Sequence, residues 1–460
     1  MPRASFTGAF AGAVDDAAGG MFQLRRYATV VRSVGLLVEA VGIEVRLGSI
    51  CHLLTSEGEV AAEVVGFDQG RSYLMPLSAG AAIQPGTLVS VSNQQGGETT
   101  LPAPEALLGR VVDGLCRPID GGPGLADPAV AVRTDSINPM ERHPIDRPLD
   151  VGVQAINALL TVGQGQRVGL FAGSGVGKSV LLGMLARFVV ADVVIVGLIG
   201  ERGREVQEFV LDNLGEGLAR AVVIACPADD SAALRLRGAR LATRIAEQFR
   251  AQGKQVLLLM DSLTRVAQAQ REIGLAMGEP PSAKGYTPSA FAALPKLVER
   301  AGNGANREAG SITAFYTVLM EEDDLQDPVV DAARAILDGH IVLSRELAEA
   351  GIYPAIDVAN SVSRVMNRVV EDGQLQAARV FRQLWQRYRE QEDLISIGAY
   401  SAGSDPLTDL AIKLYPAMCE FIRQSALQSC DFAQSAQMLN QLMDSAASNA
   451  PVPVQQSQVT

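Results

Sequence analysis

The stretch AGSGVGKS, residues Ala172 to Ser179, decides the fold of this chain. It follows an apolar run at 168–171 and precedes a run of helix-forming residues, which is the context that a phosphate-binding loop requires. Glycines at 173, 175 and 177 allow backbone N–H groups to turn inward around a phosphate, and the N-terminus of the following helix adds positive potential. We therefore predict a nucleotide-binding loop that consists of Gly173, Ser174, Gly175, Val176, Gly177, Lys178, Ser179 and Val180.

Two side chains of this loop carry chemistry. Lys178 would reach the β- and γ-phosphates of ATP, and the Ser179 hydroxyl would ligate Mg2+. The strict form of the motif begins with glycine, whereas this chain has Ala172, a departure that leaves the later glycines, Lys178 and Ser179 unchanged. The sequence therefore predicts ATP and Mg2+ as the bound groups.

Acidic residues follow two apolar runs of the same region. The run 256–260 is followed by Asp261, which could orient magnesium through water. The phrase GLIGERGRE, residues 197–205, offers Glu201 as the group that activates water, with Arg202 and Glu205 near the phosphates and the magnesium water shell. A solvated charge cluster is the alternative explanation of this phrase. Its position at the end of a strand beside the loop favours the catalytic interpretation.

Strand-like and helical runs alternate around the loop, which predicts an α/β core with a mainly parallel sheet between helices. Short β-rich runs with glycine punctuation precede the core and predict a small antiparallel barrel. After the core, Phe381, Leu384, Trp385 and Tyr388 have helical spacing and are expected to pack in a helical core.

We expect helices to begin after Asp327 and Asp405, each of which precedes a proline. The predicted organisation is a flexible tail at 1–20, a β-barrel domain at 21–95, a linker leading into the core at 96–143, a P-loop ATPase domain at 144–366, a helical domain at 367–440 and a disordered tail at 441–460. Residues 1–20 could alternatively dock a partner.

Composition narrows the class of protein. The chain has 460 residues, of which 48% are hydrophobic and 20% are charged, as in multidomain globular proteins. Five scattered cysteines without a C-x-x-C pair suggest neither zinc nor disulfides and favour a reducing cytosol. The sequence lacks a signal peptide pattern and any apolar run near the ~20 residues of a membrane span. A net charge of -12 weighs against a dedicated nucleic-acid binder.

Further phrases extend the match beyond a generic ATPase. The phrases GERGREV, LLLMDSLTR, GSITAFYTVL, DDLQDP, LDGHIVLSR and GIYPAID occur in this order. From about Arg26 to Asp431 the chain closely resembles the ATPase of the flagellar export apparatus. That family is itself similar to the catalytic subunits of rotary ATP synthases and to the ATPases of virulence-type secretion. The resemblance implies a RecA-like P-loop core and hydrolysis of ATP.

The resemblance also implies roles for individual residues. Glu201 would polarise the attacking water, Asp261 would belong to the magnesium element, and Arg265 would approach the γ-phosphate. Tyr353 in GIYPAID matches the aromatic residue that stacks on adenine, although such a tyrosine could simply pack. Arg364 matches the arginine that a neighbouring subunit inserts against the γ-phosphate.

Partners and location follow from the same resemblance. It implies a homohexamer in the cytoplasm, peripheral at the inner face of the cytoplasmic membrane, without a transmembrane segment. Implied partners are a regulatory stator-like export protein, a central stalk protein, the export gate and chaperone–substrate complexes. The ring would couple ATP hydrolysis to chaperone release, unfolding and export of flagellar subunits.

Four other functions remain as alternatives. The nearest is the ATPase of a virulence-type type III secretion system, followed by a rotary synthase subunit. A ring-shaped RNA translocase is disfavoured because residues 24–93 hold only Tyr27, Phe67 and Tyr73 as aromatics for base stacking. A nucleotide-binding scaffold without catalysis is disfavoured by Glu201.

Overall fold

The computed structural model describes residues 27–78, 82–91, 100–125, 130–131, 137–320, 324 and 326–448. The chain divides into two compact units, Met1–Gly97 and Glu98–Thr460. The predicted tail at 1–20, the first residues of the predicted barrel domain at 21–26 and the end of the chain at 449–460 lie outside the described residues.

The first unit contains a closed antiparallel barrel with the strand order β1-β2-β5-β4-β3-β6. Alternate residues such as Ala28 and Val30 are buried inside the barrel with Cys51, Leu53 and Val64, as expected for strands with one solvated face. This confirms the predicted small β-barrel. The strands are β1 Tyr27–Val34, β2 Leu37–Val41, β3 Ile50–Thr55, β4 Gly58–Asp68, β5 Arg71–Pro76 and β6 Leu88–Val91.

The second unit is built on a nine-stranded sheet with the order β19-β18-β12-β17-β15-β13-β14-β8, in which β16 pairs only with β17. The strands from β18 to β8 along this order are parallel, and the edge strand β19 is antiparallel to β18. The strands are β8 Val111–Val112, β12 Arg167–Ala172, β13 Val193–Ile199, β14 Ala221–Cys226, β15 Gln255–Asp261, β16 Gly302–Asn303, β17 Ser311–Leu319, β18 Gly339–Leu343 and β19 Ile356–Ser363.

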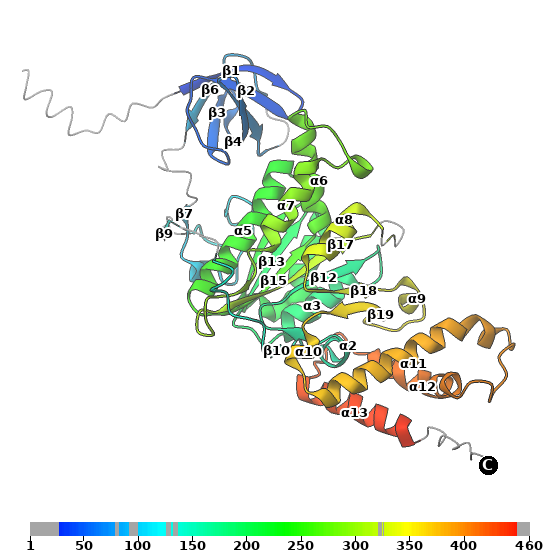
Figure 1. Ribbon diagram of the computed structural model, residues 1–460. Coiled ribbons are helices and arrows are strands. Elements are labelled where there is room, and N and C mark those ends of the chain that lie inside the picture. The colour runs from blue at the N-terminus through cyan, green and yellow to red at the C-terminus, as the bar shows by residue number, and fades with distance from the viewer. Residues whose placement is uncertain are drawn as a thin grey trace, which may run out of the picture. The chain divides into compact units, whose positions relative to one another are not determined.

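Helices cover this sheet on both faces (Figure 1). The central strands β12, β13 and β15 are almost wholly buried. Burial on both faces explains why their sequences are continuous apolar runs without alternating polar residues. A mainly parallel sheet between helices confirms the predicted α/β core. The helices around the sheet are α2 Gln154–Leu159, α3 Lys178–Phe188, α4 Gly203–Glu208, α5 Ala232–Ala251, α6 Leu263–Ala276, α7 Pro288–Val298, α8 Pro328–Ile336, α9 Arg345–Glu349 and α10 Met366–Val369.

Short elements complete the second unit. Two small antiparallel pairs join β7 Thr100–Leu101 to β9 Val130–Ala131 and β10 Pro148–Leu149 to β11 Val162–Gly163. After Glu201 the chain forms α4 and then a π-helical turn, η2 Phe209–Leu214. The 3-10 turns are η1 Pro104–Leu107, η3 Gly215–Arg220 and η4 Ala283–Gly285.

The structure corrects two of the predicted boundaries. The segment 96–143 is more than a linker, because β8 inside it pairs in parallel with β14 and extends the core sheet. Val111 and Val112 are buried there, but a two-residue strand is too short to show a periodic signal. The helix α13, Phe432–Ser448, continues past residue 440 into the predicted disordered tail, since Leu439 and Met443 share one buried helix face.

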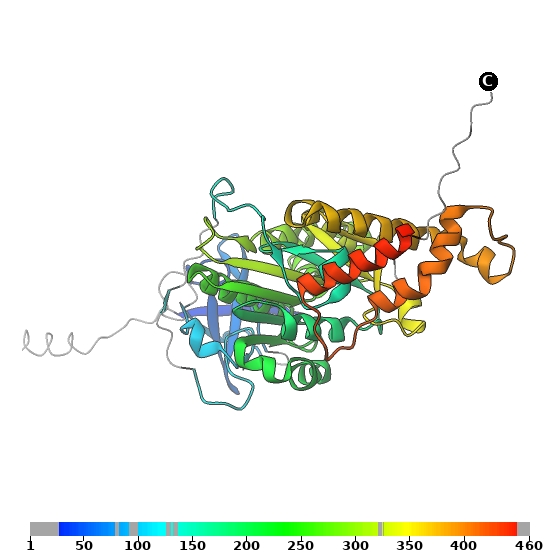
Figure 2. The same ribbon diagram turned by 90° about the horizontal axis from the view of Figure 1, so that it is seen from below.

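The C-terminal helices α11 Asp372–Ser396, α12 Pro406–Ile422 and α13 lie together at one end of the second unit (Figures 1 and 2). Their apolar faces are continuous with the core beneath α2 and α3, where Phe381, Leu384 and Trp385 are buried. The predicted caps are also confirmed, because the Asp327 and Asp405 carboxylates accept hydrogen bonds from the first turns of α8 and α12.

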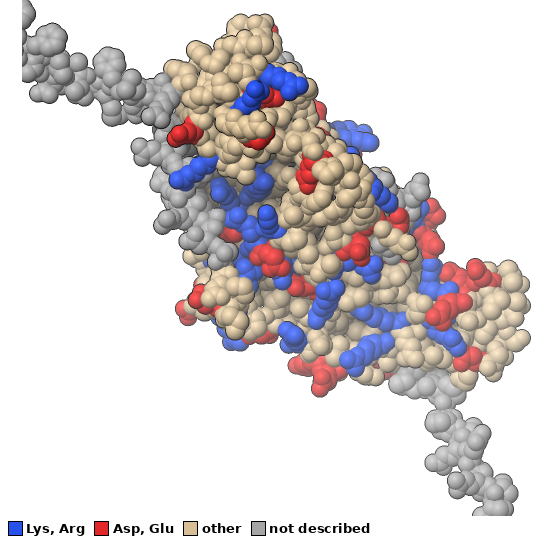
Figure 3. Space-filling model, turned by 45° about the horizontal axis from the view of Figure 1, so that its top comes forward, with Lys and Arg blue, Asp and Glu red and all other residues tan. Residues whose placement is uncertain are grey.

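On the face drawn in Figure 3, basic and acidic side chains are interspersed. Among the described residues, no helix combines the length and the apolar character that crossing a membrane requires.

Replacement of Phe381 by Ala should destabilise the helical end of the second unit by about 3–5 kcal/mol, because the ring is fully buried between Trp385 and Phe421. Trp385 is the only tryptophan, so its fluorescence during urea unfolding reports on this region. The matched control is Ile397→Ala, whose side chain is 75% exposed and should leave the midpoint almost unchanged. Equal shifts in both variants would contradict the burial argument.

Candidate active site

The phosphate-binding loop connects the end of β12 to the start of α3. Gly175 and Gly177 have positive φ angles of 80° and 90°, a backbone conformation that side-chain-bearing residues rarely adopt. Gly177 is the N-cap of α3, so the first N–H groups of that helix are directed toward the loop. The loop therefore has the backbone geometry and the positive helix end that bind phosphate.

Lys178 connects the loop to two carboxylates from neighbouring strands. Its Nζ lies 2.7 Å from Asp261 Oδ1 and 3.2 Å from Glu201 Oε1. Asp261 is the last residue of β15, and Glu201 comes directly after β13 and Gly200. The structure thus brings together Lys178, Glu201 and Asp261, which are far apart in the sequence, at the carboxyl edge of the sheet.

Burial sets the electrostatics of this cluster. It raises the pKa of Asp261 and the pKa of Glu201 above their usual values although the Lys178 ammonium opposes both shifts. The Glu205 carboxyl raises the pKa of Glu201 further. For Lys178, burial would lower the pKa, but the two carboxylates outweigh it and hold this pKa above its usual range. Glu201 therefore has more affinity for a proton than a solvated glutamate, as a group that accepts a proton from water requires.

The residues next to Glu201 differ in their degree of burial. Gly200 leaves room for the Arg265 side chain, because a Cβ at Gly200 would lie 2.9 Å from Arg265 Cγ. Arg265 donates from Nη1 to Gln268, while its buried Nε has no hydrogen-bond partner among the described residues. Arg202 is largely exposed and lies 3.7 Å from Glu205. Arg265 thus lies against Gly200, the residue before Glu201, whereas Arg202 extends into solvent.

Tyr353 lies beside the loop. A Cβ at Gly177 would lie 3.4 Å from the Tyr353 ring, so the ring lies against the loop. The Tyr353 side chain is half-exposed. The Tyr353 backbone carbonyl accepts a hydrogen bond of 2.9 Å from Gln424 N, in the segment between α12 and α13. An exposed aromatic face beside the phosphate-binding loop is suited to stack on a planar base.

Arg364 lies at the opposite edge of the sheet. Its backbone N donates to Asp338 O, and Asp338 N donates to the carbonyl of Arg167, the first residue of β12. The loop begins at the other end of this six-residue strand, roughly 16 Å away at about 3.3 Å per residue. The Arg364 guanidinium is exposed and donates to Arg334 O at 3.1 Å. The structure therefore does not bring Arg364 to the loop of its own chain.

Two residues of this region were not predicted from the sequence. Thr317 on β17 is fully buried and donates to Asp261 Oδ1 at 2.6 Å, which fixes the carboxylate that Lys178 contacts. A hydroxyl inside the apolar strand Ser311–Leu319 was the available signal. No sequence signal pointed to Gln424, whose backbone N–H supports Tyr353. Its side chain also accepts from Gln154 N and donates to Gly152 O, and both of these residues are remote in sequence.

The oxygen donors at the loop fit a magnesium ion that is held mainly by nucleotide phosphates. Ser179 is exposed at the start of α3 and Asp261 ends β15, so a hydroxyl and a carboxylate are available. Within the described part of the chain, no group of three or more His, Cys, Asp or Glu could hold a metal. Mg2+ typically uses one or two protein oxygens together with phosphates and water, which is what this donor set offers.

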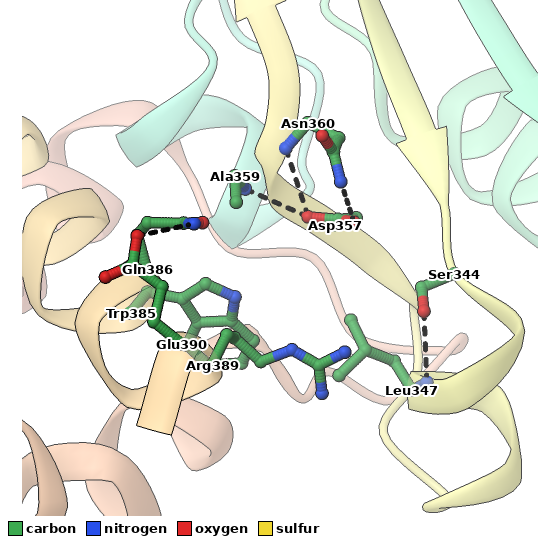
Figure 4. A pocket seen from close by; sticks show the side chains of 9 residues that line it. All are labelled: Ser344, Leu347, Asp357, Ala359, Asn360, Trp385, Gln386, Arg389 and Glu390. Carbon is green, nitrogen blue, oxygen red and sulfur yellow. Dashed lines mark hydrogen bonds between the residues drawn. The ribbon is translucent and has the colours of Figure 1, made fainter. Parts of the chain in front are cut away.

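A separate cavity of about 270 Å³ opens between β19 and α11. Asp357 and Asn360 of β19 lie across it from Trp385 and Arg389 of α11 (Figure 4). The Asp357 carboxylate accepts hydrogen bonds from the backbone and side chain of Asn360, so both of its oxygens are engaged within β19. None of the lining residues belongs to the phosphate-binding loop, and the cavity is distinct from the nucleotide cluster.

A glycine-rich loop between a central parallel strand and a helix, with a buried lysine between two strand-end carboxylates, defines a P-loop nucleoside triphosphatase. Comparison with known proteins specifies the class further. The model of the ATP synthase alpha/beta family, nucleotide-binding domain, matches residues 152–363, and that of the T3SS EscN ATPase C-terminal domain matches residues 370–441.

Curated relatives match almost the whole chain. It is 57% identical to the flagellum-specific ATP synthase of Pseudomonas aeruginosa over 90% of this chain and 92% of that protein. It is 46% identical to the type 3 secretion system ATPase of Xanthomonas euvesicatoria over 92% and 95%. The structure of the assembled ATPase EscN from enteropathogenic E. coli matches with a TM-score of 0.83 and 42% identity, covering 90% of this chain and 99% of that one.

The chain belongs to the family of flagellar and type III secretion ATPases. It is an ATP hydrolase, and its higher identity to the flagellar relative than to the secretion relative supports flagellar export as its function. The predicted fold class and family are thereby confirmed.

The acid limb of kcat/KM for ATP should lie above pH ~4.3, the pKa of a solvated glutamate, because burial raises the pKa of Glu201. As the proton acceptor, Glu201 would have to be deprotonated, so activity should be lost as pH falls through this raised pKa. The variant Glu205→Gln should move the limb to lower pH, since Glu205 raises the pKa of Glu201. Titration of ATP is the same for both proteins, so an unmoved limb would contradict the assignment.

Proposed function

We propose that this chain forms a homohexamer in which each ATP site is completed by Arg364 of the adjacent subunit. The observation that carries the proposal is the position of Arg364, at the opposite edge of the sheet from the loop of its own chain. With an exposed arginine at one edge of the sheet and a phosphate site at the other, identical subunits arranged head to tail can each supply Arg364 to the ATP site of the next subunit. The similar ATPase EscN was solved in its assembled form, which supports the proposal that this chain also assembles.

Within each site we assign roles to the clustered residues. Lys178 would bind the β- and γ-phosphates, and Glu201 would accept a proton from the attacking water. Ser179 and Asp261 would hold Mg2+, with Glu205 near its water shell, and the ion would neutralise phosphate charge. Gly173 to Val180 would surround the phosphates, Tyr353 would stack on adenine, and Arg265 and Arg202 would stand near the γ-phosphate. The support is the geometry around Lys178, Gly177 and Gly200.

We further propose that hydrolysis drives chaperone release, unfolding and export of flagellar subunits at the inner face of the cytoplasmic membrane. Partners would be a regulatory stator-like protein, the export gate, chaperone–substrate complexes and a central stalk. Support for the stalk is that EscN was solved in complex with its central stalk EscO, at a TM-score of 0.80 to this chain. A virulence-type system is the second candidate, because a secretion ATPase is 46% identical.

Replacing Glu201 with Gln should lower turnover by at least ~10²-fold while ATP binding and ring formation persist, because the amide cannot accept the proton. Turnover is measured as phosphate release and binding with a fluorescent ATP analogue. Glu208→Gln is the matched control, since this exposed residue pairs with Arg204 on α4, away from Lys178. Near-normal turnover in Glu201→Gln would refute its role.

The variant Arg364→Ala should lose on the order of 10³-fold or more in turnover, the range for an arginine supplied by a neighbour. Lys178→Ala should be inactive for a different reason, because its own loop is defective. Mixing the two variants should restore part of the activity, since a Lys178→Ala subunit donates an intact Arg364 to an intact loop. Absence of recovery in rings shown to contain both variants would rule out an arginine acting between subunits.

A further inference from the structure

The backbone that carries Arg364 is fixed to the segment between α8 and β18. Arg364 N donates to Asp338 O at 3.0 Å, and its guanidinium donates to Arg334 O at 3.1 Å. The start of β18 packs tightly against the end of β19, since a Cβ at Gly339 would lie 2.4 Å from Val362 O. Any displacement of Asp338 would therefore displace Arg364.

Asp338 is itself held by the first residue of β12. Its carboxylate accepts three hydrogen bonds from Arg167, from N at 3.0 Å, from Nε at 2.9 Å and from Nη2 at 3.1 Å. Asp338 N donates back to Arg167 O at 2.9 Å. The pair is largely shielded from solvent, with side-chain exposures of 18% for Arg167 and 24% for Asp338. A carboxylate with this many charge-assisted contacts has a fixed position.

Gln166 ties the same segment to β19. Its Nε2 donates to Asp338 O at 3.1 Å and to Ser363 Oγ at 3.3 Å, and its Oε1 accepts from Gly163 N at 2.8 Å. The side chain is fully buried. The Gln166 side-chain amide therefore links the Asp338 carbonyl, which accepts the Arg364 N–H, to Ser363, the residue before Arg364.

From these contacts we propose that Asp338, held by Arg167 and supported by Gln166, is a positioning residue that sets Arg364 for catalysis in the adjacent subunit. The inference rests on the proposed role of Arg364 between subunits. Asp338 does not touch the nucleotide cluster of its own chain, because it lies at the amino end of β12 and the loop lies at the carboxyl end. Its effect on hydrolysis is transmitted to the neighbouring site through the backbone of Arg364.

An opposite assignment is that Asp338 supports the loop of its own chain through β12. The two assignments differ in which subunit of an interface is defective after mutation. If Asp338 positions Arg364, an Asp338 variant should behave like Arg364→Ala. If Asp338 supports the loop of its own chain, the variant should behave like Lys178→Ala.

The first test is steady-state kinetics of Asp338→Asn. Loss of the charged contact to Arg167 should lower kcat at least about tenfold with KM for ATP changed less than about twofold, because a displacement of about 1 Å can cost up to ~10²-fold in rate. Gln166→Met is a second variant, which removes the amide contacts without adding charge and should act in the same direction.

Glu299→Gln is the matched control, because Glu299 is the other carboxylate on Arg167, at 2.5 Å, and it is largely exposed and absent from the contacts to Arg364. It should retain the kcat of the unmodified protein. An equal loss of kcat in Glu299→Gln would overturn the assignment, because the loss would then arise from any change in the contacts of Arg167 and would not be specific to Asp338.

The decisive test is mixing of variants in one ring. Asp338→Asn with Lys178→Ala should recover activity, as Arg364→Ala with Lys178→Ala does, whereas Asp338→Asn with Arg364→Ala should not recover. The reverse pattern would overturn the positioning role, because it would place the defect at the loop of the same chain. Failure of Arg364→Ala and Lys178→Ala to recover would instead refute the proposed function. Gln166→Met goes through the same mixtures if Asp338→Asn does not assemble.

Discussion

The parallel alignment of β12, β13 and β15 is the constraint on which the rest of the structure depends. In a parallel sheet the carboxyl ends of all strands lie at one edge, so residues that follow different strands meet there. Glu201 and Asp261 come together for this reason, and the loop that follows β12 places Lys178, the first residue of α3, between them. The Lys178 Nζ lies 2.7 Å from Asp261 and 3.2 Å from Glu201 as a result.

Burial then gives the cluster its chemistry. Two carboxylates and one ammonium lie where water is largely excluded, and each interaction between them is stronger than at the surface. The carboxylates have raised pKa values, while Lys178 keeps its charge because both face it. Thr317 adds a fixed hydrogen bond to Asp261, so the carboxylate does not depend on the lysine alone for its orientation.

The opposite edge of the same sheet serves a different purpose. Arg167 begins the strand whose other end is the phosphate-binding loop, and it holds Asp338, whose carbonyl receives the Arg364 N–H. The amino edge therefore orders an exposed arginine, and the carboxyl edge orders a phosphate site. A chain that carries these two sites at opposite edges of one sheet is suited to assemble head to tail.

The sequence by itself determined the class of fold and the loop. AGSGVGKS between an apolar strand and a helix, and the apolar runs that became β13 and β15, have strong local signals because periodicity and glycine geometry are local properties. It also named Glu201 and Asp261, since both come after such runs. The family resemblance supplied Tyr353 and Arg364, for which spacing alone gives no distinctive pattern.

Only the tertiary structure decided which residues meet. The pairing of β8 with β14 and the continuation of α13 to Ser448 depend on partners remote in sequence, so the predicted linker and tail were misplaced. The contacts of Thr317 with Asp261 and of Gln424 with Tyr353 likewise arise from packing between distant segments. The separation of Arg364 from its own loop follows from strand order and register. Both depend on pairing between strands that are remote in sequence, which no local sequence pattern reveals.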